Sequence, residues 1–187
     1  MEITISGIPG SGKSTLARGL AKKLGLSYFS SGNIRRAIAS AFGLTIDQLN
    51  KIGEKFAVTD RLVDELIARL LKKDFVLDAR LGWWLFPKSI KIFLTCSLDV
   101  AARRILKAKR KSEESYKNIN EVKREIRKRM ASDKLRYKRY YGISDVYAIK
   151  NFDIIIDTTK LSKKEMINKC LDLISKIKRI KKNKTQR

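Results

Sequence analysis

Residues 7–14 read GIPGSGKS and match the phosphate-loop pattern G-x-x-x-x-G-K-[ST] in full. Glycines in such a loop let the backbone wrap closely around a polyphosphate, because a Cβ would clash or forbid the required dihedral angles. We expect Lys13 to reach the β- and γ-phosphates and Ser14 to hold a Mg²⁺ ion that bridges them. The spacing therefore predicts a nucleoside triphosphate site formed by Gly7, Ile8, Pro9, Gly10, Ser11, Gly12, Lys13, Ser14 and Thr15.

Further polar residues follow the next β-rich segments of the chain. Ser31 and Arg36 come just after the segment LSYFS, and Asp78 and Arg80 follow DFVLD. Ligands of open parallel sheets bind outside the carboxyl ends of the strands, where these side chains are expected. Arginine suits a second phosphate, because its planar fork binds oxygens bidentately and stays charged. Predicted helices add Arg61, Arg104, Arg129 and Arg136.

Each of these arginines also has a plainer interpretation. Arg36 and Arg61 are compatible with solvated helix faces. Arg129, Asp133 and Arg136 follow one another by i+4 and i+3 steps on one helix face, which is also the pattern of a surface salt-bridge ladder.

The composition limits the chemistry. The chain has 187 residues and no histidine, which excludes imidazole as a base, proton shuttle or metal ligand. A phosphate acceptor is already an oxyanion and needs little or no general base, so such chemistry tolerates the missing histidine. Cys96 and Cys170 are too few for a zinc site and are expected to be reduced core thiols. Without a signal peptide or an apolar membrane span, we expect a soluble cytoplasmic protein that makes no membrane contact.

The net charge of +24 is unevenly distributed. Residues 103–139 hold 16 basic and 5 acidic residues, and residues 176–187 hold 7 basic and none acidic. We interpret the first block as part of a polyanion site combined with an exposed helix. The tail, about residues 178–187, is expected to be a solvated helix end, and a nucleic-acid contact is the less favoured alternative.

Apolar segments at 2–6, 26–30, 74–78, 89–96 and 152–157 predict five strands, three of them continuous enough for a buried parallel sheet. Helical patterns lie between them, at residues 14–25, 33–41, 45–56, 59–72, 98–109 and about 119–140, and a last helix starts at Ser162. Alternating strands and helices predict one α/β domain with a doubly wound parallel sheet. No N-K-x-D string for guanine is present, and the length leaves little room for a motor, so a small kinase is favoured.

The segments GIPGSGKST, SSGNIRRAIA, TDRLVDELI, FVLDARLGW, KIFLTCSLDVAARRI and KRMASDKLRYKRYYGI, in this order, resemble the archaeal type of cytidylate kinase over nearly all of residues 1–160. Two positions depart from the family pattern. Asp78-Ala79-Arg80 stands where relatives commonly have Glu-Gly-Arg, and Ala108 stands where they often have arginine.

The resemblance implies a P-loop kinase fold of a five-stranded parallel sheet flanked by helices. It also implies a monophosphate-binding insertion at about 30–72 and a helical lid at about 104–139. The activity implied is transfer of the ATP γ-phosphate to CMP or dCMP. We expect the protein to use Mg²⁺ and to be a monomer. Acceptor binding would fall to Ser31, Gly32, Arg36, Arg61, Asp78 and Arg80. Arg104 would contact ATP, and Lys13, Arg80, Arg129 and Arg136 would serve catalysis.

The sequence is also compatible with other functions. The residues do not show which base is read, so AMP, UMP or another small phosphate ester stays open as the acceptor. An RNA- or ribosome-associated P-loop ATPase is the rival from another class, because of the basic lid and tail. Trp83 and Trp84 are able to stack on a base, but we favour packing roles for both.

Overall fold

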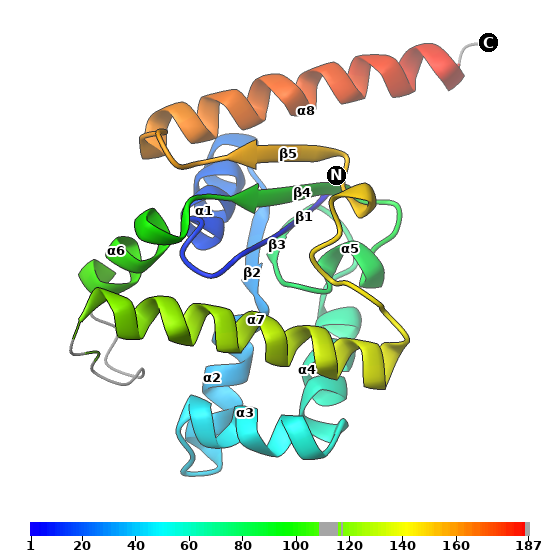
Figure 1. Cartoon of the computed structure of the whole chain (residues 1–187). Coiled ribbons are helices and arrows are strands. Elements are labelled where there is room, and N and C mark those ends of the chain that lie inside the picture. The colour runs from blue at the N-terminus through cyan, green and yellow to red at the C-terminus, as the bar shows by residue number, and fades with distance from the viewer. Residues whose placement is uncertain (109–115, 117, 186–187) are drawn as a thin grey trace.

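A computed structural model describes residues 1–108, 116 and 118–185. Five strands form one parallel sheet in the order β2-β3-β1-β4-β5 (Figure 1). The strands are β1 (Glu2–Gly7), β2 (Ser27–Ser30), β3 (Phe75–Asp78), β4 (Ile90–Thr95) and β5 (Ile154–Asp157). The predicted five-stranded parallel sheet is confirmed, and each strand falls within or beside its predicted segment.

The helices follow the predicted order along the chain. Their bounds are α1 (Lys13–Leu24), α2 (Ser31–Ala41), α3 (Ile46–Lys55), α4 (Val58–Leu70), α5 (Gly82–Leu85), α6 (Leu98–Ala108), α7 (Ile119–Tyr141) and α8 (Lys163–Thr185). Helix α2 begins two residues earlier than expected, because the Ser30 side chain caps it by accepting a bond from the Asn33 amide. The short α5 and a 3₁₀ turn at Ile149–Asn151 had no pattern that predicted them.

The sheet is buried between two layers of helices. The side chains of Ile3, Ile5, Ile92 and Leu94 face α1 and the first half of α8 and form the main core with them. On the other face Phe93 packs against Tyr147, Tyr137 and Leu81, beneath α5 and α7. Burial on both faces explains the near-continuous apolar sequence of these strands. Both cysteines are buried and free, as expected for core thiols.

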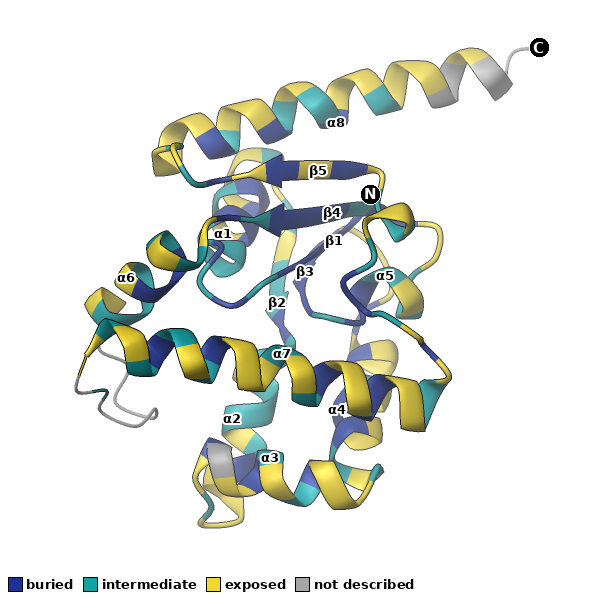
Figure 2. Cartoon of the chain, viewed as in Figure 1, coloured by how far each residue is buried: buried dark blue, intermediate teal, exposed yellow. Residues whose placement is uncertain are grey.

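Helices α2, α3 and α4 project beyond the carboxyl ends of β2 and β3, and α7 lies across them (Figure 1). The face of α7 that is turned to the protein is buried at Val122, Ile126 and Asp133, whereas its outer face is exposed (Figure 2). Across the described ranges, no helix combines the length and apolar character needed to span a bilayer. The fold thus places α7 over the space between the phosphate loop and the α2–α4 segment.

Candidate active site

The phosphate loop connects β1 to α1 and contains three glycines with positive φ, Gly7, Gly10 and Gly12. A Cβ on Gly7 would lie 2.2 Å from the Leu94 carbonyl oxygen, and one on Gly10 would lie 2.7 Å from that of Ala101. Glycine is therefore required by close backbone approach as well as by dihedral angle. The loop opens at the N-terminus of α1, where backbone amides and the helix dipole favour a bound anion.

Lys13 is folded onto the loop. Its Nζ donates to the carbonyl oxygens of Gly7 at 3.0 Å and Ile8 at 2.8 Å. Burial lowers the pKa of Lys13 to about 8; Arg80 and Arg129 also lower it, and Asp78 opposes them. A bound polyphosphate would supply negative charge beside the ammonium group and so would stabilise its protonated form.

Ser14 and Asp78 form the best candidate for a cation site. The Ser14 Oγ donates to the Asp78 Oδ2 at 2.5 Å, and Asp78, the last residue of β3, is only 6% exposed. Within the described residues no group of three or more histidine, cysteine or acidic side chains is arranged to hold a metal. One carboxylate and one hydroxyl suit Mg²⁺, which keeps several waters and also binds substrate phosphates. The sequence had suggested only an acceptor role for Asp78.

The start of α2 lies beside this pair. The Ser31 Oγ donates to the Asp78 backbone carbonyl at 3.3 Å, which ties α2 to the end of β3. The Arg36 Nη2 donates to the Asn33 Oδ1 at 2.7 Å. A Cβ on Gly32 would lie 3.6 Å from both Nη atoms of Arg36, so the guanidinium lies next to this glycine. The fold therefore brings Ser31, Gly32 and Arg36 to the sheet edge that carries Asp78.

Arg80 enters the site from the segment after β3 and pairs with α7. Its Nε lies 2.5 Å from the Asp133 Oδ2 and donates to the Tyr147 hydroxyl at 3.3 Å. Its two Nη atoms have no hydrogen-bond partner in the part of the chain that the structure describes. Arg80 is thus held at one nitrogen and offers two more to a ligand.

A buried ion network extends from this pair along α7. Asp133, which is 1% exposed, also accepts from the Arg136 Nη2 at 2.7 Å and from the Tyr147 hydroxyl at 2.6 Å. The Arg136 Nη1 donates to both carboxylate oxygens of Asp60 at 2.6 Å. Arg35 adds a bond of 3.2 Å to the same carboxylate. The interpretation of Asp133 and Arg136 as a surface ladder is therefore wrong, because both are buried.

Opposite charges keep this network ionised. Burial alone would raise the pKa of Asp133, but Arg80 and Arg136 outweigh it and lower that pKa. Burial would lower the pKa of Arg80, and Asp133 with Tyr147 raises it instead. Burial raises the pKa of Tyr147, with Asp133 adding to the effect, so the hydroxyl remains a donor. The Nε of Arg136 is buried and has no hydrogen-bond partner among the described residues.

The remaining predicted arginines lie in three different settings. Arg129 is close enough to Lys13 and Asp133 to influence both pKa values. Arg104 donates to the side chain and the carbonyl of Thr158 at 2.9 and 2.8 Å. Thr158 in turn donates to the Ser11 carbonyl at 2.9 Å, so Arg104 supports the phosphate loop through a residue that sequence reasoning missed. Arg61 is exposed on α4, beside Val58, Leu62 and Glu65.

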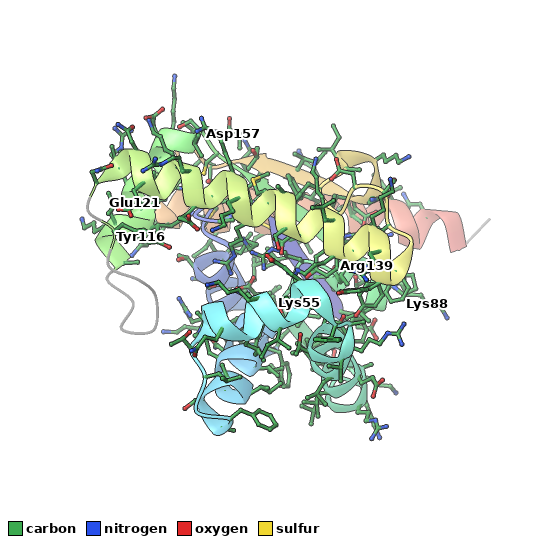
Figure 3. All side chains as sticks on the ribbon, turned by 60° about the horizontal axis from the view of Figure 1, so that its bottom comes forward. Lys55, Lys88, Tyr116, Glu121, Arg139 and Asp157 are labelled. Carbon is green, nitrogen blue, oxygen red and sulfur yellow. The ribbon has the colours of Figure 1, made fainter. Side chains whose placement is uncertain are left out.

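The structure thus brings most of the predicted site residues together beyond the carboxyl ends of the strands, and it leaves Arg61 outside this group. The residues brought together are those of the loop with Ser31, Gly32, Arg36, Asp78, Arg80, Arg104 and Arg129. Helix α7 lies over α3 in the side-chain view, with Arg139 and Lys55 labelled on the two helices (Figure 3). The Tyr140 hydroxyl donates to the Gly53 carbonyl at 3.0 Å, which fixes this contact. The predicted lid region includes residues 109–115 and 117, which lie outside the described residues.

The chain is similar to known proteins along most of its length. The cytidylate kinase-like family model matches residues 2–160. A cytidylate kinase from Methanothrix thermoacetophila is 37% identical over 179 residues, covering 95% of this chain and 100% of that protein. One from Sulfolobus acidocaldarius is 36% identical over 180 residues, covering 94% and 95%.

Solved structures support the fold alone, because their sequences are more distant. Shikimate kinase from Acinetobacter baumannii has a TM-score of 0.61 and 21% identity, with 95% of this chain and 94% of that chain covered. Shikimate kinase from Bacteroides thetaiotaomicron has a TM-score of 0.63 and 17% identity, with 94% and 98% covered. From the family match and the near-complete coverage of its relatives, the chain belongs to the cytidylate kinase-like family.

Proposed function

We propose that this protein is a cytidylate kinase that transfers the γ-phosphoryl group of ATP to CMP or dCMP, giving ADP and CDP or dCDP. The observation that carries the proposal is the position of the phosphate loop. The loop is linked to Asp78 through Ser14, and Ser31 bonds to the same Asp78 from the other side, next to Arg36 and Arg80. A donor phosphate site and an acceptor phosphate site therefore lie together beyond the carboxyl ends of the strands. The names of the relatives supply the base, since cytidine is not read from the geometry.

The residues on the donor side bind and polarise the triphosphate. Lys13 exchanges its two carbonyl acceptors for β- and γ-phosphate oxygens, and the loop amides hold the remaining oxygens. Ser14 and Asp78 would hold Mg²⁺, which supplies charge neutralisation between the phosphates when bound. Arg104 keeps Thr158 and the loop in place from the side.

The residues on the acceptor side bring a second anion close. Arg36 and the free Nη atoms of Arg80 bind the acceptor phosphate, and Arg129 approaches from α7. An oxygen of this phosphate attacks the γ-phosphorus while the bond to the β–γ bridging oxygen breaks, releasing ADP. The attacking oxygen is already negative, so the reaction needs no histidine base. Arg136 is held by Asp60 and Asp133, and its contact with the transferred group stays a prediction.

In this proposal the α2–α4 segment, about 30–72, is the acceptor-binding insertion, and the region of about 104–139 is the lid that excludes water. In this proposal the protein acts as a monomer, and the groups for both nucleotides come from one chain. Arg61 keeps its predicted acceptor role only if the segment moves, since it is exposed on α4.

A panel assay tests the proposal. ADP production from ATP is measured with CMP, dCMP, UMP, AMP, GMP or no acceptor, and CMP or dCMP should give the highest kcat/KM. A preference for AMP or UMP would overturn the cytidine assignment while keeping the kinase. Acceptor-independent ATP hydrolysis that RNA stimulates would overturn the kinase itself. Arg36→Ala is the matched variant, and it should raise the KM for the acceptor far more than the KM for ATP.

A further inference from the structure

An open pocket of about 460 Å³ lies at the amino ends of β4 and β5, at the opposite end of the strands from the phosphate loop. Its walls come from α5 and from the 149–153 segment that leads into β5, together with Lys91 near the amino end of β4. The phosphate loop instead lies beyond the carboxyl ends, where Gly7 is paired with Leu94. The pocket is therefore separate from the nucleotide sites described above.

Aromatic rings form the apolar part of this pocket. Trp83, Trp84 and Phe152 all line it. Trp83 packs edge-on against Phe152, with ring centroids 5.9 Å apart, and so gives the wall a fixed shape. The rings of Trp84 and Tyr141 pack in a T-shaped arrangement with centroids 5.3 Å apart, and Trp84 remains 43% exposed. An exposed indole in a fixed position is a platform on which a base can stack.

Two cations stand beside the rings. Lys91 and Lys150 line the pocket, and neither has an ion-pair partner within the described ranges. One carboxylate is also present, that of Asp153, which accepts a bond of 2.8 Å from the Lys91 amide. Lys88 is exposed at the same end of the molecule (Figure 3). Aromatic rings with adjacent unpaired cations suit a base and its phosphate.

Helix α8 extends the positive surface at this end. Among the α8 side chains that the structure describes, Ile177 is the last one that packs against the main core. Beyond it Lys178, Arg179 and Ile180 are all exposed, and the helix runs on past the amino end of β5 (Figure 1). The sequence of residues 176–187 has seven basic residues and no acidic one. A single nucleotide in the pocket would not use these charges, whereas a longer phosphate backbone would.

We propose that this pocket, lined by Trp83, Trp84, Phe152, Lys91 and Lys150, and the projecting end of α8 together bind single-stranded nucleic acid. A base stacks on Trp84, and the flanking phosphates contact the lysines and the helix end. A duplex is not the expected ligand, because its bases are already stacked and cannot reach the indole. Binding here is independent of the kinase reaction, since the pocket shares no residue with the loop or the acceptor side.

The two tryptophans of the chain both line the pocket, so intrinsic fluorescence reports on it directly. A short oligouridylate should quench this fluorescence. Its association constant should fall as the KCl concentration rises, and the logarithm of the constant should have a slope of about −0.7 against the logarithm of the KCl concentration for each phosphate contact. Absence of quenching at low salt would overturn the proposal. So would quenching that free CMP or ATP reproduces in full, or binding of equal strength to anionic phospholipid vesicles or to a duplex.

Variants are compared by the anisotropy of a fluorescein-labelled oligouridylate. Trp84→Ala should weaken binding about tenfold through lost stacking. Lys150→Glu should weaken it several-fold and reduce the salt slope, and deletion of residues 179–187 should reduce the slope further. Lys22→Glu is the matched control, with the same charge change on an exposed position of α1, and should have little effect.

CMP kinase activity serves as the folding control and should be unchanged in each variant. Equal affinities for the wild type, Trp84→Ala and Lys150→Glu would overturn the proposed location. Loss of RNA affinity in Lys22→Glu to the same extent as in Lys150→Glu would show a general charge effect and overturn it as well.

Discussion

The donor and acceptor halves of the site are built by different means. The donor half relies on backbone: three glycines, helix-terminal amides and one lysine that donates to two loop carbonyls. The acceptor half relies on side chains. Arg80, Asp133, Arg136 and Asp60 form a largely buried chain of ion pairs between the segment after β3, α7 and α4. Backbone geometry is local in sequence, whereas the ion pairs join residues as far apart as Asp60 and Arg136. Activity should therefore depend on individual groups in the donor half. In the acceptor half it should depend on the ion-pair network as a whole.

Replacing Lys13 by alanine should have the largest effect on activity and little effect on folding. The ammonium group is the main side-chain cation of the donor half, so kcat/KM for CMP phosphorylation should fall by about 10³-fold. The Tm should stay close to wild type, because among the described residues the lysine bonds to two loop carbonyls and nothing else. Turnover near the wild-type rate would contradict the assignment of the loop.

Replacing Asp133 by asparagine should damage both folding and activity. It leaves the buried Arg136 and the largely buried Arg80 with an incomplete set of partners, and breaking a buried pair costs about 3–5 kcal/mol. Denaturant unfolding measures the stability, and the kcat/KM for CMP should fall as Arg80 loses its orientation.

Glu125→Gln is the control on the same helix. Its pair with Lys128 is exposed and spans 3.9 Å, so the unfolding free energy should change by less than about 1 kcal/mol. Equal effects of the two variants would remove the distinction between a buried network and ordinary surface charge.

Asp64, which connects α4 to α7 through Tyr141, should make the stability of the protein depend on pH. Burial raises the pKa of Asp64 to about 6, although the bond donated by Tyr141 at 2.5 Å opposes the rise. Because the folded pKa is above the unfolded value, this group's stabilising contribution is full below about pH 4 and lost as pH rises through about 6. Asp64→Asn should therefore raise stability at neutral pH by about 2 kcal/mol, and have little effect near pH 4. A wild-type stability advantage at neutral pH would contradict the raised pKa.

The smallest expected effect concerns the charge of Lys13 itself. With a pKa of about 8 in the free protein and a higher value beside phosphates, ATP binding should take up a proton above pH 8. Titration calorimetry in two buffers should show this uptake, and ATP affinity should fall by about tenfold between about pH 7 and about pH 9. Lys13→Arg, which stays charged, should lose this pH dependence of ATP affinity. If the variant kept the pH dependence, the titrating group would be another residue.

The strand and helix order was predictable because buried parallel strands and amphipathic helices leave local patterns. The 2–6 and 89–96 segments became β1 and β4, and the capping pair Ser162 and Glu165 is present at the start of α8. Helix α5 was not predictable, because its single turn GWWL has no period and is held by the close packing of Gly82 on Thr4.

The amino-acid sequence by itself determined the phosphate loop, the sheet and the family, because each depends on neighbouring residues or on a period along the chain. Only the tertiary structure decided the partners of the charged side chains. It placed Asp78 on Ser14, buried Asp133 between two arginines with Tyr147, and left Arg61 exposed. A charge acquires its role from desolvation and from the opposite charges beside it. Those neighbours come from distant segments, which no local pattern can specify.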